Sequence, residues 1–319
     1  MLHFEENGIE RLVEVKFRDR EHLMDIIDRI VSPIGRRVDA SSPIVDAYLP
    51  DKSRVNIVLD PIAVTGPFLT IRKFVQQMTI EELVRRETFP AEIIPVFKMV
   101  AESALNFIVS GGTGGGKTTI LNAIARYIPH DQSIVTIEDV LELDLQHPKV
   151  RSLITRPANI EGKGAITAKQ LLINTLRMKP KRIVIGEVRD EVIDEALRAM
   201  NTGHPGSPFS IHANSPDELP ETVEYLSPRS RDSILSRFGK TVQIIIQVNQ
   251  LDDGTGRRRV THISQVKGYQ KGQVIIENLF EYDYGTDQLI RTNLPFYYAE
   301  KLKKKRIEVP EILLQVGGK

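Results

Sequence analysis

The sequence predicts an α/β protein, in which a mainly parallel sheet is flanked by helices and a smaller α+β domain lies at the amino end. Three observations support this fold class. Short apolar runs alternate with helical stretches after residue 105, as buried parallel strands do. A glycine-rich turn separates the first of these runs from a helical stretch. The length of 319 residues, at about 150 residues per domain, predicts two domains.

Charge and composition restrict the class of protein. The chain has 43 lysines and arginines against 42 acidic residues, and this net charge of +1 argues against a dedicated nucleic-acid binder, which usually carries a basic surplus. The absence of cysteine excludes disulfides and thiolate metal sites. No apolar run approaches the roughly 18 residues of a membrane span, and the acidic start lacks the pattern of a signal peptide. We therefore expect a soluble, cytoplasmic protein.

Residues 1–74 are predicted to form the smaller α+β domain. Its expected elements are a strand over 12–17, a helix over 20–31, two strands within 44–59 joined by a turn at 49–52, and a strand over 69–72. The strands alternate apolar and polar residues, and the helix repeats apolar residues at helical spacing. Residues 75–90 are predicted to be the linker, although Thr79 and Glu82 within it have the spacing of a helix capping box.

Residues 91–319 are predicted to form the larger α/β domain. The expected strands are 105–109, 133–137, 182–185, 209–211 and 242–248, and the expected helices are 117–127, 167–178 and 192–200. Short buried strands separated by helices indicate a mainly parallel sheet with helices on its faces. The basic run at 301–306 is expected to be a solvated tail, with contact to a membrane surface as the alternative.

The segment from Gly111 to Thr118 reads GGTGGGKT and satisfies the pattern G-x-x-x-x-G-K-[ST]. Glycines let the backbone wrap around phosphate oxygens, and the following helix adds its N-terminal dipole. Lys117 is expected to reach the β- and γ-phosphates and the Thr118 hydroxyl to bind Mg²⁺. A flexible glycine loop without a ligand is the alternative. The residues predicted to bind ATP here are Gly112, Thr113, Gly114, Gly115, Gly116, Lys117, Thr118 and Thr119.

Carboxylates follow two of the predicted strands. Glu138 and Asp139 end the strand at 133–137, with Glu142 just beyond, and Glu187 follows the strand at 182–185. Acidic residues at the carboxyl ends of strands beside a phosphate-binding loop can meet the metal and the attacking water. Because acidic residues also commonly begin helices as caps, each position has a structural alternative.

Two histidines form a third group. His204 lies in the segment GHPGS at 203–207, and His212 closes the strand at 209–211 in the segment HANS. A histidine at the tip of a strand can sense the γ-phosphate. A lone histidine is more often structural, and that alternative stays open for both.

With these motifs in this order, the chain resembles the secretion ATPases of the type II/type IV secretion superfamily, and in particular the CpaF-like ATPases of Tad/Flp pilus assembly. The resemblance runs from about residue 10 to about residue 285. It is carried by the P-loop at 111–119, the acidic box at 136–142, the Walker B segment at 185–190, the histidine box at 203–215, the segments 155–157 and 176–177, and the amino-terminal segments 42–47, 53–56 and 66–74.

The resemblance implies a role for each matched residue. It implies that Lys117 and Thr118 bind phosphate and Mg²⁺, that Glu187 positions or activates water and approaches the metal, and that Asp139 helps to hold the metal. It further implies catalytic roles for Glu138, Glu142 and His212, and a nucleotide-linked role for His204. Arg54 and Arg72 match arginines that reach the phosphates, for which surface salt bridging is the alternative. Arg156, Arg177 and Arg189 are candidates for phosphate or inter-subunit contacts.

The resemblance also implies the assembly. It implies a PAS-like amino-terminal domain and a RecA-like motor domain that hold ATP and Mg²⁺ between them in a homo-hexamer. The ring is expected at the cytoplasmic face of the inner membrane, attached through platform proteins and without a dedicated nucleic-acid partner. Alternatives are a conjugative type IV secretion or archaeal pilus/archaellum ATPase, a RecA-like nucleic-acid translocase, and a regulatory nucleotide-binding module.

Overall fold

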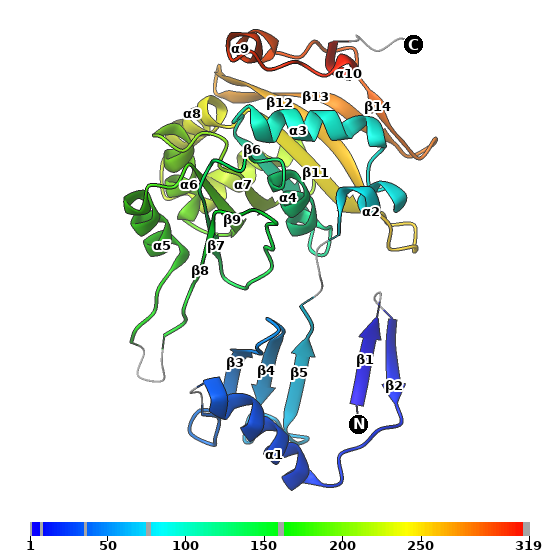
Figure 1. Ribbon diagram of the computed structural model, residues 1–319, viewed down its shortest axis with the longest axis vertical. Helices are drawn as coiled ribbons and strands as arrows, with labels where there is room; N and C mark the ends of the chain where they lie inside the picture. The colour runs from blue at the N-terminus through cyan, green and yellow to red at the C-terminus, as the bar shows by residue number, and fades with distance from the viewer. Residues whose placement is uncertain (1, 7–8, 35–36, 75–77, 159–162, 315–319) are drawn as a thin grey trace. The chain divides into compact units, whose positions relative to one another are not determined.

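The computed structural model describes residues 2–6, 9–34, 37–74, 78–158 and 163–314 (Figure 1). The chain divides into two compact units, Met1–Gln76 and Gln77–Lys319, and each is described by itself. Among the described residues, we find no helix with the length and apolar character needed to span a bilayer.

The first unit is a small three-stranded antiparallel sheet packed on one helix. The sheet order is β3-β4-β5, and a separate hairpin pairs β1 with β2. The bounds are β1 (Leu2–Glu6), β2 (Ile9–Val13), α1 (Arg20–Val31), β3 (Ile44–Tyr48), β4 (Arg54–Val58) and β5 (Phe68–Arg72), with a 3₁₀ turn at Ser32–Ile34. Ile27 and Val31 of α1 pack with Val55 and Ile57 of β4 in the core of this unit. The helix and the three later strands predicted from the sequence are confirmed.

The strand predicted over 12–17 is wrong in its extent. The structure places β2 at Ile9–Val13, where it pairs with β1 alone. Leu12 and Val15, two apolar residues of the alternating pattern, remain 64% and 62% exposed. A two-stranded ribbon has no face packed against a hydrophobic core, so the apolar side chains of the alternating pattern stay exposed.

The second unit is built on a nine-stranded sheet of order β14-β13-β12-β11-β6-β10-β9-β7-β8. The six strands from β11 to β8 are mutually parallel, and β12, β13 and β14 add an antiparallel extension. The bounds are β6 (Phe107–Gly111), β7 (Ile134–Glu138), β8 (Val150–Ile154), β9 (Arg182–Val188), β10 (Phe209–His212), β11 (Ile244–Gln250), β12 (Arg258–Gln270), β13 (Gln273–Asp283) and β14 (Gln288–Arg291). The predicted parallel sheet is confirmed, whereas most of its antiparallel extension was not foreseen.

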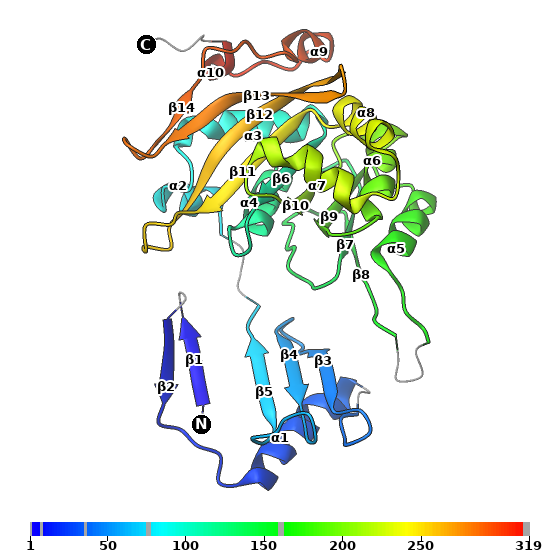
Figure 2. The same ribbon diagram turned by 180° about the vertical axis from the view of Figure 1, so that it is seen from behind.

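Helices cover both faces of this sheet. Figure 1 shows α3 and α4 on one face, and Figure 2 shows α6, α7 and α8 on the other. The first layer contains α2 (Ile80–Arg85), α3 (Ile94–Glu102), α4 (Lys117–Ala125), α9 (Ala299–Lys304) and α10 (Glu311–Leu314); the second contains α5 (Ala168–Thr175), α6 (Val192–Asn201), α7 (Leu219–Leu226) and α8 (Arg231–Thr241). Single 3₁₀ turns lie at Ala91–Ile93, Leu176–Met178 and Pro216–Glu218. Each layer buries its own cluster of apolar side chains against the sheet.

The segment predicted to be a linker, 75–90, contains helix α2. Thr79 caps this helix by accepting a hydrogen bond from the backbone N–H of Glu82 at 3.2 Å. The Glu82 carboxylate pairs with Arg86 at 3.3 Å. Ile80 and Leu83 are buried in the core of the second unit, so this stretch contributes packing to that unit.

The basic side chains at 301–306 are exposed, as a solvated segment requires, but the run is not a free tail. Most of it lies in α9, where Leu302 is 0% exposed within the core of the second unit. The ammonium of Lys305 donates to the backbone oxygen of Ser103 at 2.7 Å. The apolar residue inside the basic run therefore anchors it to the fold, while the neighbouring lysines remain at the surface.

Candidate functional site

The glycine-rich loop lies between the end of β6 and the start of α4, as the motif requires. Gly114 and Gly116 have positive φ angles of +72° and +97°, which favour glycine. A Cβ on Gly111 would overlap the backbone oxygen of Val248 in β11, and a Cβ on Gly115 would lie 2.9 Å from the same oxygen. The glycines therefore let the loop pass close to β11 while its N–H groups and the start of α4 form an anion-binding geometry.

The Lys117 side chain folds back over this loop. Its ammonium donates to the carbonyl oxygens of Gly111 at 3.2 Å and Gly112 at 3.1 Å. It also lies 3.7 Å from Oε1 of Glu187, at the end of β9, and the Lys117 side chain is 10% exposed. The fold thus brings together the lysine and the glutamate that the sequence separates by 70 positions.

The acidic box joins the same edge of the sheet through Glu142. The Thr118 hydroxyl donates to Oε2 of Glu142 at 3.2 Å. Glu138 is buried, and its Oε1 accepts from the backbone N–H groups of Glu142 at 2.9 Å and Leu143 at 2.7 Å. Glu138 therefore shapes the turn that presents Glu142. The catalytic role that the resemblance implies for Glu138 stays a prediction.

A hydroxyl and a carboxylate at this distance fit a magnesium ion, because Mg²⁺ prefers hard oxygen ligands and one or two carboxylates beside phosphate. Thr118 and Glu142 are the residues that would hold it. Asp139, predicted to be a metal ligand, points elsewhere: its Oδ1 accepts from the Thr155 hydroxyl at 2.9 Å. The structure thus places Glu142, rather than Asp139, at the Thr118 hydroxyl.

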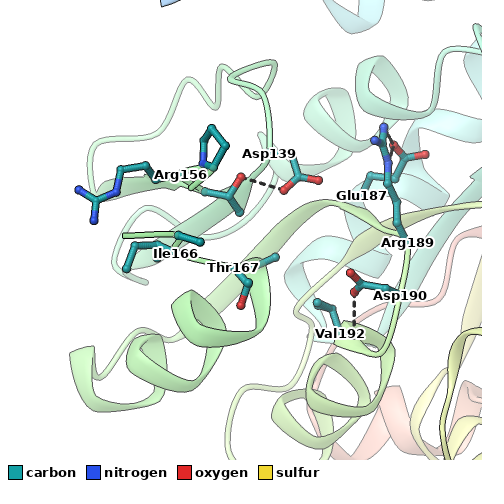
Figure 3. Close-up of a pocket in the computed structure, with 12 residues that line it drawn as sticks. Asp139, Arg156, Ile166, Thr167, Glu187, Arg189, Asp190 and Val192 are labelled. Atoms are coloured by element: carbon teal, nitrogen blue, oxygen red, sulfur yellow. Dashed lines mark hydrogen bonds and ion pairs between the residues drawn. The ribbon is translucent and has the colours of Figure 1, made fainter. Parts of the chain in front are cut away.

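Asp139 and Glu187 lie on the wall of a pocket of about 310 Å³ at the carboxyl ends of β7, β8 and β9 (Figure 3). The pocket is lined by Asp139, Thr155, Arg156, Pro157, Ala165, Ile166, Thr167, Ala168, Glu187, Arg189, Asp190 and Val192. Arg156 is one of these lining residues, and its Nε donates to the carbonyl oxygen of Gly164 at 2.7 Å.

Glu187 lies between two cations. Its Oε2 accepts from Nε of Arg189 at 2.7 Å and also from Nη2 of that residue, and its Oε1 faces Lys117. The hydrogen bond to Glu187 raises the pKa of Arg189 above its ordinary value. Figure 3 shows the Glu187 and Arg189 side chains directed toward one another. The Glu187 carboxylate therefore has a positively charged side chain on each side.

His212 lies at the same edge of the sheet as the P-loop. It ends β10, is exposed, and pairs in register with Gly111 of the neighbouring β6. His204 does not lie there. It precedes β10, and its Nδ1 is 3.0 Å from the carbonyl oxygen of Pro180, which precedes β9. The structure therefore places His204 at the amino ends of the parallel strands, away from the P-loop of the same chain, and its nucleotide-linked role stays a prediction.

The segment around His204 instead encloses a buried arginine. The guanidinium of Arg182 donates to the carbonyl oxygens of Gly206 at 2.9 Å and Ala101 at 3.0 Å and to Gln132 at 2.6 Å. Burial lowers the pKa of Arg182 to about 10. Gly206 has a φ of +73°, and a Cβ there would overlap the guanidinium. This part of the histidine box is thus packing around the start of β9.

The two amino-terminal arginines are neighbours within the first unit. Arg54 in β4 and Arg72 in β5 are paired in register, so their side chains leave the same face of the sheet. Arg54 forms an ion pair with Asp46 at 3.2 Å. Arg177, in a 3₁₀ turn, is exposed. The phosphate and inter-subunit roles of these residues stay predictions.

Two residues that contact the site region were not foreseen. Nε of Arg258, at the start of β12, donates to the carbonyl oxygen of Gly114 at 2.7 Å. Gln247 in β11 accepts a hydrogen bond from Ser110, the residue before the P-loop. Both lie more than 130 positions along the chain from the residues that they contact, and no local pattern indicates that β11 lies beside β6.

Known proteins resemble this chain in sequence and in overall fold. A putative conjugal transfer protein of Mycobacterium tuberculosis is 35% identical over 273 residues, covering 82% of this chain and 76% of that protein. The conjugal transfer protein TrbB of Rhizobium radiobacter is 29% identical over 259 residues, covering 79% and 77%. The ATPase DotB of Yersinia pseudotuberculosis has a similar fold, with a TM-score of 0.59 at 17% identity over 97% of this chain and 85% of that one.

The RecA-like α/β fold that the sequence predicts is confirmed by this structural likeness. The family model described as type II/IV secretion system protein matches residues 1–305. The chain, with a P-loop, an acidic box and a Walker B glutamate at one edge of its sheet, belongs to the type II/IV secretion system protein family.

Proposed function

We propose that this protein hydrolyses ATP with Mg²⁺ at the P-loop and that the turnover drives a secretion or pilus-assembly machine. The observation that carries the proposal is the 3.7 Å approach of Lys117 to Glu187, above a glycine loop at the start of a helix. Phosphoryl transfer depends on positioning and on charge that stabilises the transferred group, and this arrangement supplies both.

Each group at this edge has a distinct task in the proposed reaction. Lys117 exchanges its contacts with the loop carbonyls for phosphate oxygens, and Glu187, held by Arg189, orients the attacking water. Thr118 and Glu142 hold Mg²⁺, which neutralises charge on the phosphates when bound. His212, exposed beside Gly111, is the histidine placed to respond to the γ-phosphate.

The proposal includes the assembly that the family resemblance implies. Six copies form a ring at the cytoplasmic face of the inner membrane and act through platform proteins there. Arg54 and Arg72 add positive charge to the phosphates, and turnover moves the first unit against the second. The placement of Arg54 and Arg72 as a pair on one face of the small sheet supports a ligand shared by both side chains.

Two machines fit the motifs. The motif order favours a Tad/Flp pilus-assembly ATPase of the CpaF type. The similarity to the Mycobacterium tuberculosis conjugal transfer protein favours the second candidate, a conjugative type IV secretion ATPase. Genes for pilins and an inner-membrane platform beside this one would support the first, and conjugation genes the second. The near-neutral charge of +1 counts against a nucleic-acid translocase.

Two substitutions test the proposed chemistry. We expect Lys117→Ala to lose ATP binding and turnover, because the phosphates lose their ammonium partner. We expect Glu187→Gln to bind ATP and to lower kcat by at least about 100-fold, because the water is no longer oriented by a carboxylate. Steady-state phosphate release and binding of a fluorescent ATP analogue measure both.

The matched controls are Lys98→Ala and Glu102→Gln. These residues form an exposed lysine–glutamate pair on α3 at 3.8 Å, and removing such a pair changes little. Wild-type turnover in Glu187→Gln would contradict its assigned role. Native mass measurement with and without a non-hydrolysable ATP analogue tests the ring, and a persistent monomer without turnover would contradict the motor.

A further inference from the structure

One buried side chain outside the proposed catalytic groups, that of Gln247, connects the strand entering the P-loop with the loop that follows His212. Gln247 lies in β11, which pairs with β6, and its side chain is 0% exposed. Its Oε1 accepts from the hydroxyl of Ser110, the last residue before the P-loop. Its Nε2 donates to the carbonyl oxygens of Ala213 at 3.0 Å and Asn214 at 2.9 Å.

The chemistry of these partners fixes the direction of the amide. Backbone carbonyl oxygens can only accept, so the group facing Ala213 and Asn214 must be the NH₂. The amide oxygen then faces Ser110, whose hydroxyl donates. A buried amide that is satisfied at both ends holds its neighbours in one arrangement, because leaving either end without a partner is costly.

The contacts continue from Asn214 to the start of α7. The Asn214 carbonyl oxygen also accepts from Nδ2 of Asn249 at 3.3 Å. The backbone N–H and side-chain amide of Asn214 donate to Oε2 of Glu218 at 3.2 Å and 2.9 Å. Glu218 precedes α7, which packs on the face of the sheet opposite α4. A hydrogen-bonded path thus joins the P-loop strand to a helix on the far face.

We propose that Gln247 is a positioning residue that couples the P-loop strand to residues 213–218, so that nucleotide bound at the loop is reported to α7. The inference rests on the proposed ATP function. Its physical basis is a rigid element whose two ends contact two different segments, which is the connection that coupling between segments requires. A displacement of Ser110 would pull the amide away from both carbonyl oxygens or carry the loop with it.

Hydrogen exchange of residues 213–218, with and without a non-hydrolysable ATP analogue, tests this coupling. In the wild type we expect the analogue to slow exchange in this segment. Ser110→Ala removes only the hydrogen bond between Gln247 and the P-loop strand. We expect this variant to bind the analogue, but the factor by which the analogue slows exchange at 213–218 should be at least about 5-fold smaller than in the wild type. Gln247→Met removes the hydrogen bonds to Ser110 and to the carbonyl oxygens of 213–214. We expect the same reduction in the slowing of exchange, together with a fall in kcat at nearly unchanged KM.

The matched control is Ser264→Ala. Ser264 is also fully buried, and its hydroxyl donates to the amide oxygen of Asn278 at 2.7 Å, between β12 and β13. This variant should keep the wild-type slowing at 213–218. Slowing in Ser110→Ala equal to that of the wild type overturns the inference, even if Gln247→Met does not fold.

The two proposals fail differently. A wild-type protein that does not bind the analogue would overturn the proposed function and the coupling together. Wild-type binding and turnover, with slowing at 213–218 that Ser110→Ala does not reduce, would overturn the coupling alone. Wild-type binding without any slowing at this segment would do the same.

Discussion

Single atoms at the P-loop decide whether the loop can form. The backbone oxygen of Val248 lies so close to Gly111 and Gly115 that neither position has room for a side chain. The glycines of this motif are usually explained by the close approach of phosphate to the loop. Here the backbone of β11 also requires glycine, because it passes close to the loop. The sequence pattern and the packing of the sheet therefore demand glycine for two separate reasons.

We expect Gly111→Ala to destabilise the protein by about 1–3 kcal/mol, because the new methyl group must displace the backbone of β11. Gly112→Ala is the matched control, since a Cβ there has nothing within 4 Å. Urea unfolding of both variants measures the difference. Equal stability of the two would show that β11 yields without cost.

A second residue-scale effect is the pH dependence contributed by His262. Burial lowers the pKa of His262, against the opposing influence of Glu281 and Asp217. Because the folded-state pKa lies below the unfolded value of about 6.5, protons bind the unfolded chain more readily. The contribution of neutral His262 to the free energy of unfolding is therefore complete above the unfolded pKa, and it is lost as the pH falls through the folded pKa.

We therefore expect the melting temperature to fall between pH 7.5 and pH 5.5, and the fall to be smaller in His262→Gln. His3, whose side chain is half exposed with Nδ1 2.8 Å from Oε1 of Glu10 in the first unit, supplies the comparison, and His3→Gln should keep the fall seen in the wild type. An identical pH dependence in the wild type and His262→Gln would refute the assignment.

At the scale of elements, helix caps fix the edges of the candidate site. Thr167 begins α5 with a complete capping box: its hydroxyl accepts from the backbone N–H of Gln170 at 3.2 Å, and the Gln170 side chain accepts from the Thr167 N–H at 2.9 Å. Thr167 also lines the pocket that contains Glu187. The cap thus sets where one wall of the pocket begins.

We expect Thr167→Ala to cost about 1 kcal/mol of unfolding free energy, because the first turn of α5 loses its side-chain acceptor. Thr167→Ser should recover most of this loss, since serine keeps the hydroxyl. Urea denaturation of the two variants measures both values. A serine variant as unstable as the alanine variant would point to the lost methyl group instead of the cap.

At the scale of the whole molecule, the second unit is closed by segments from both ends of its sequence. Helix α3 precedes the P-loop and α9 lies near the carboxyl end, yet Val100 and Leu302 belong to the same buried cluster. The ammonium of Lys305 reaches the carbonyl oxygen of Ser103, at the end of α3. Through Leu302 and Lys305 the basic segment is therefore anchored to the second unit.

We expect Leu302→Ala to destabilise the second unit by about 2–5 kcal/mol, because it empties a fully buried site. Leu314→Ala in α10 is the control, since that side chain is 61% exposed and should change stability by less than about 0.5 kcal/mol. Thermal unfolding compares the two. Equal melting temperatures would mean that the segment dissociates before the unit unfolds.

Much of the second unit could be predicted because its parallel strands are short apolar runs and its loop motif is local. The strand predicted at 182–185 extends to Val188, and the helix predicted at 192–200 runs to Asn201. The antiparallel strands β12 to β14 could not be predicted in the same way. They mix polar and apolar residues, and Gln265 and Ser264 are fully buried through side-chain hydrogen bonds.

The sequence by itself indicated the family, the glycine-rich loop and the candidate carboxylates beside it, because each is recognised from residue types at short spacing. Tertiary structure alone decided their distances. Only the order of strands in the sheet places Glu187 against Lys117, Glu142 at Thr118 and Gln247 beside Ser110. The same order moves His204 to the opposite edge, since parallel strands carry their two ends to different sides of the sheet.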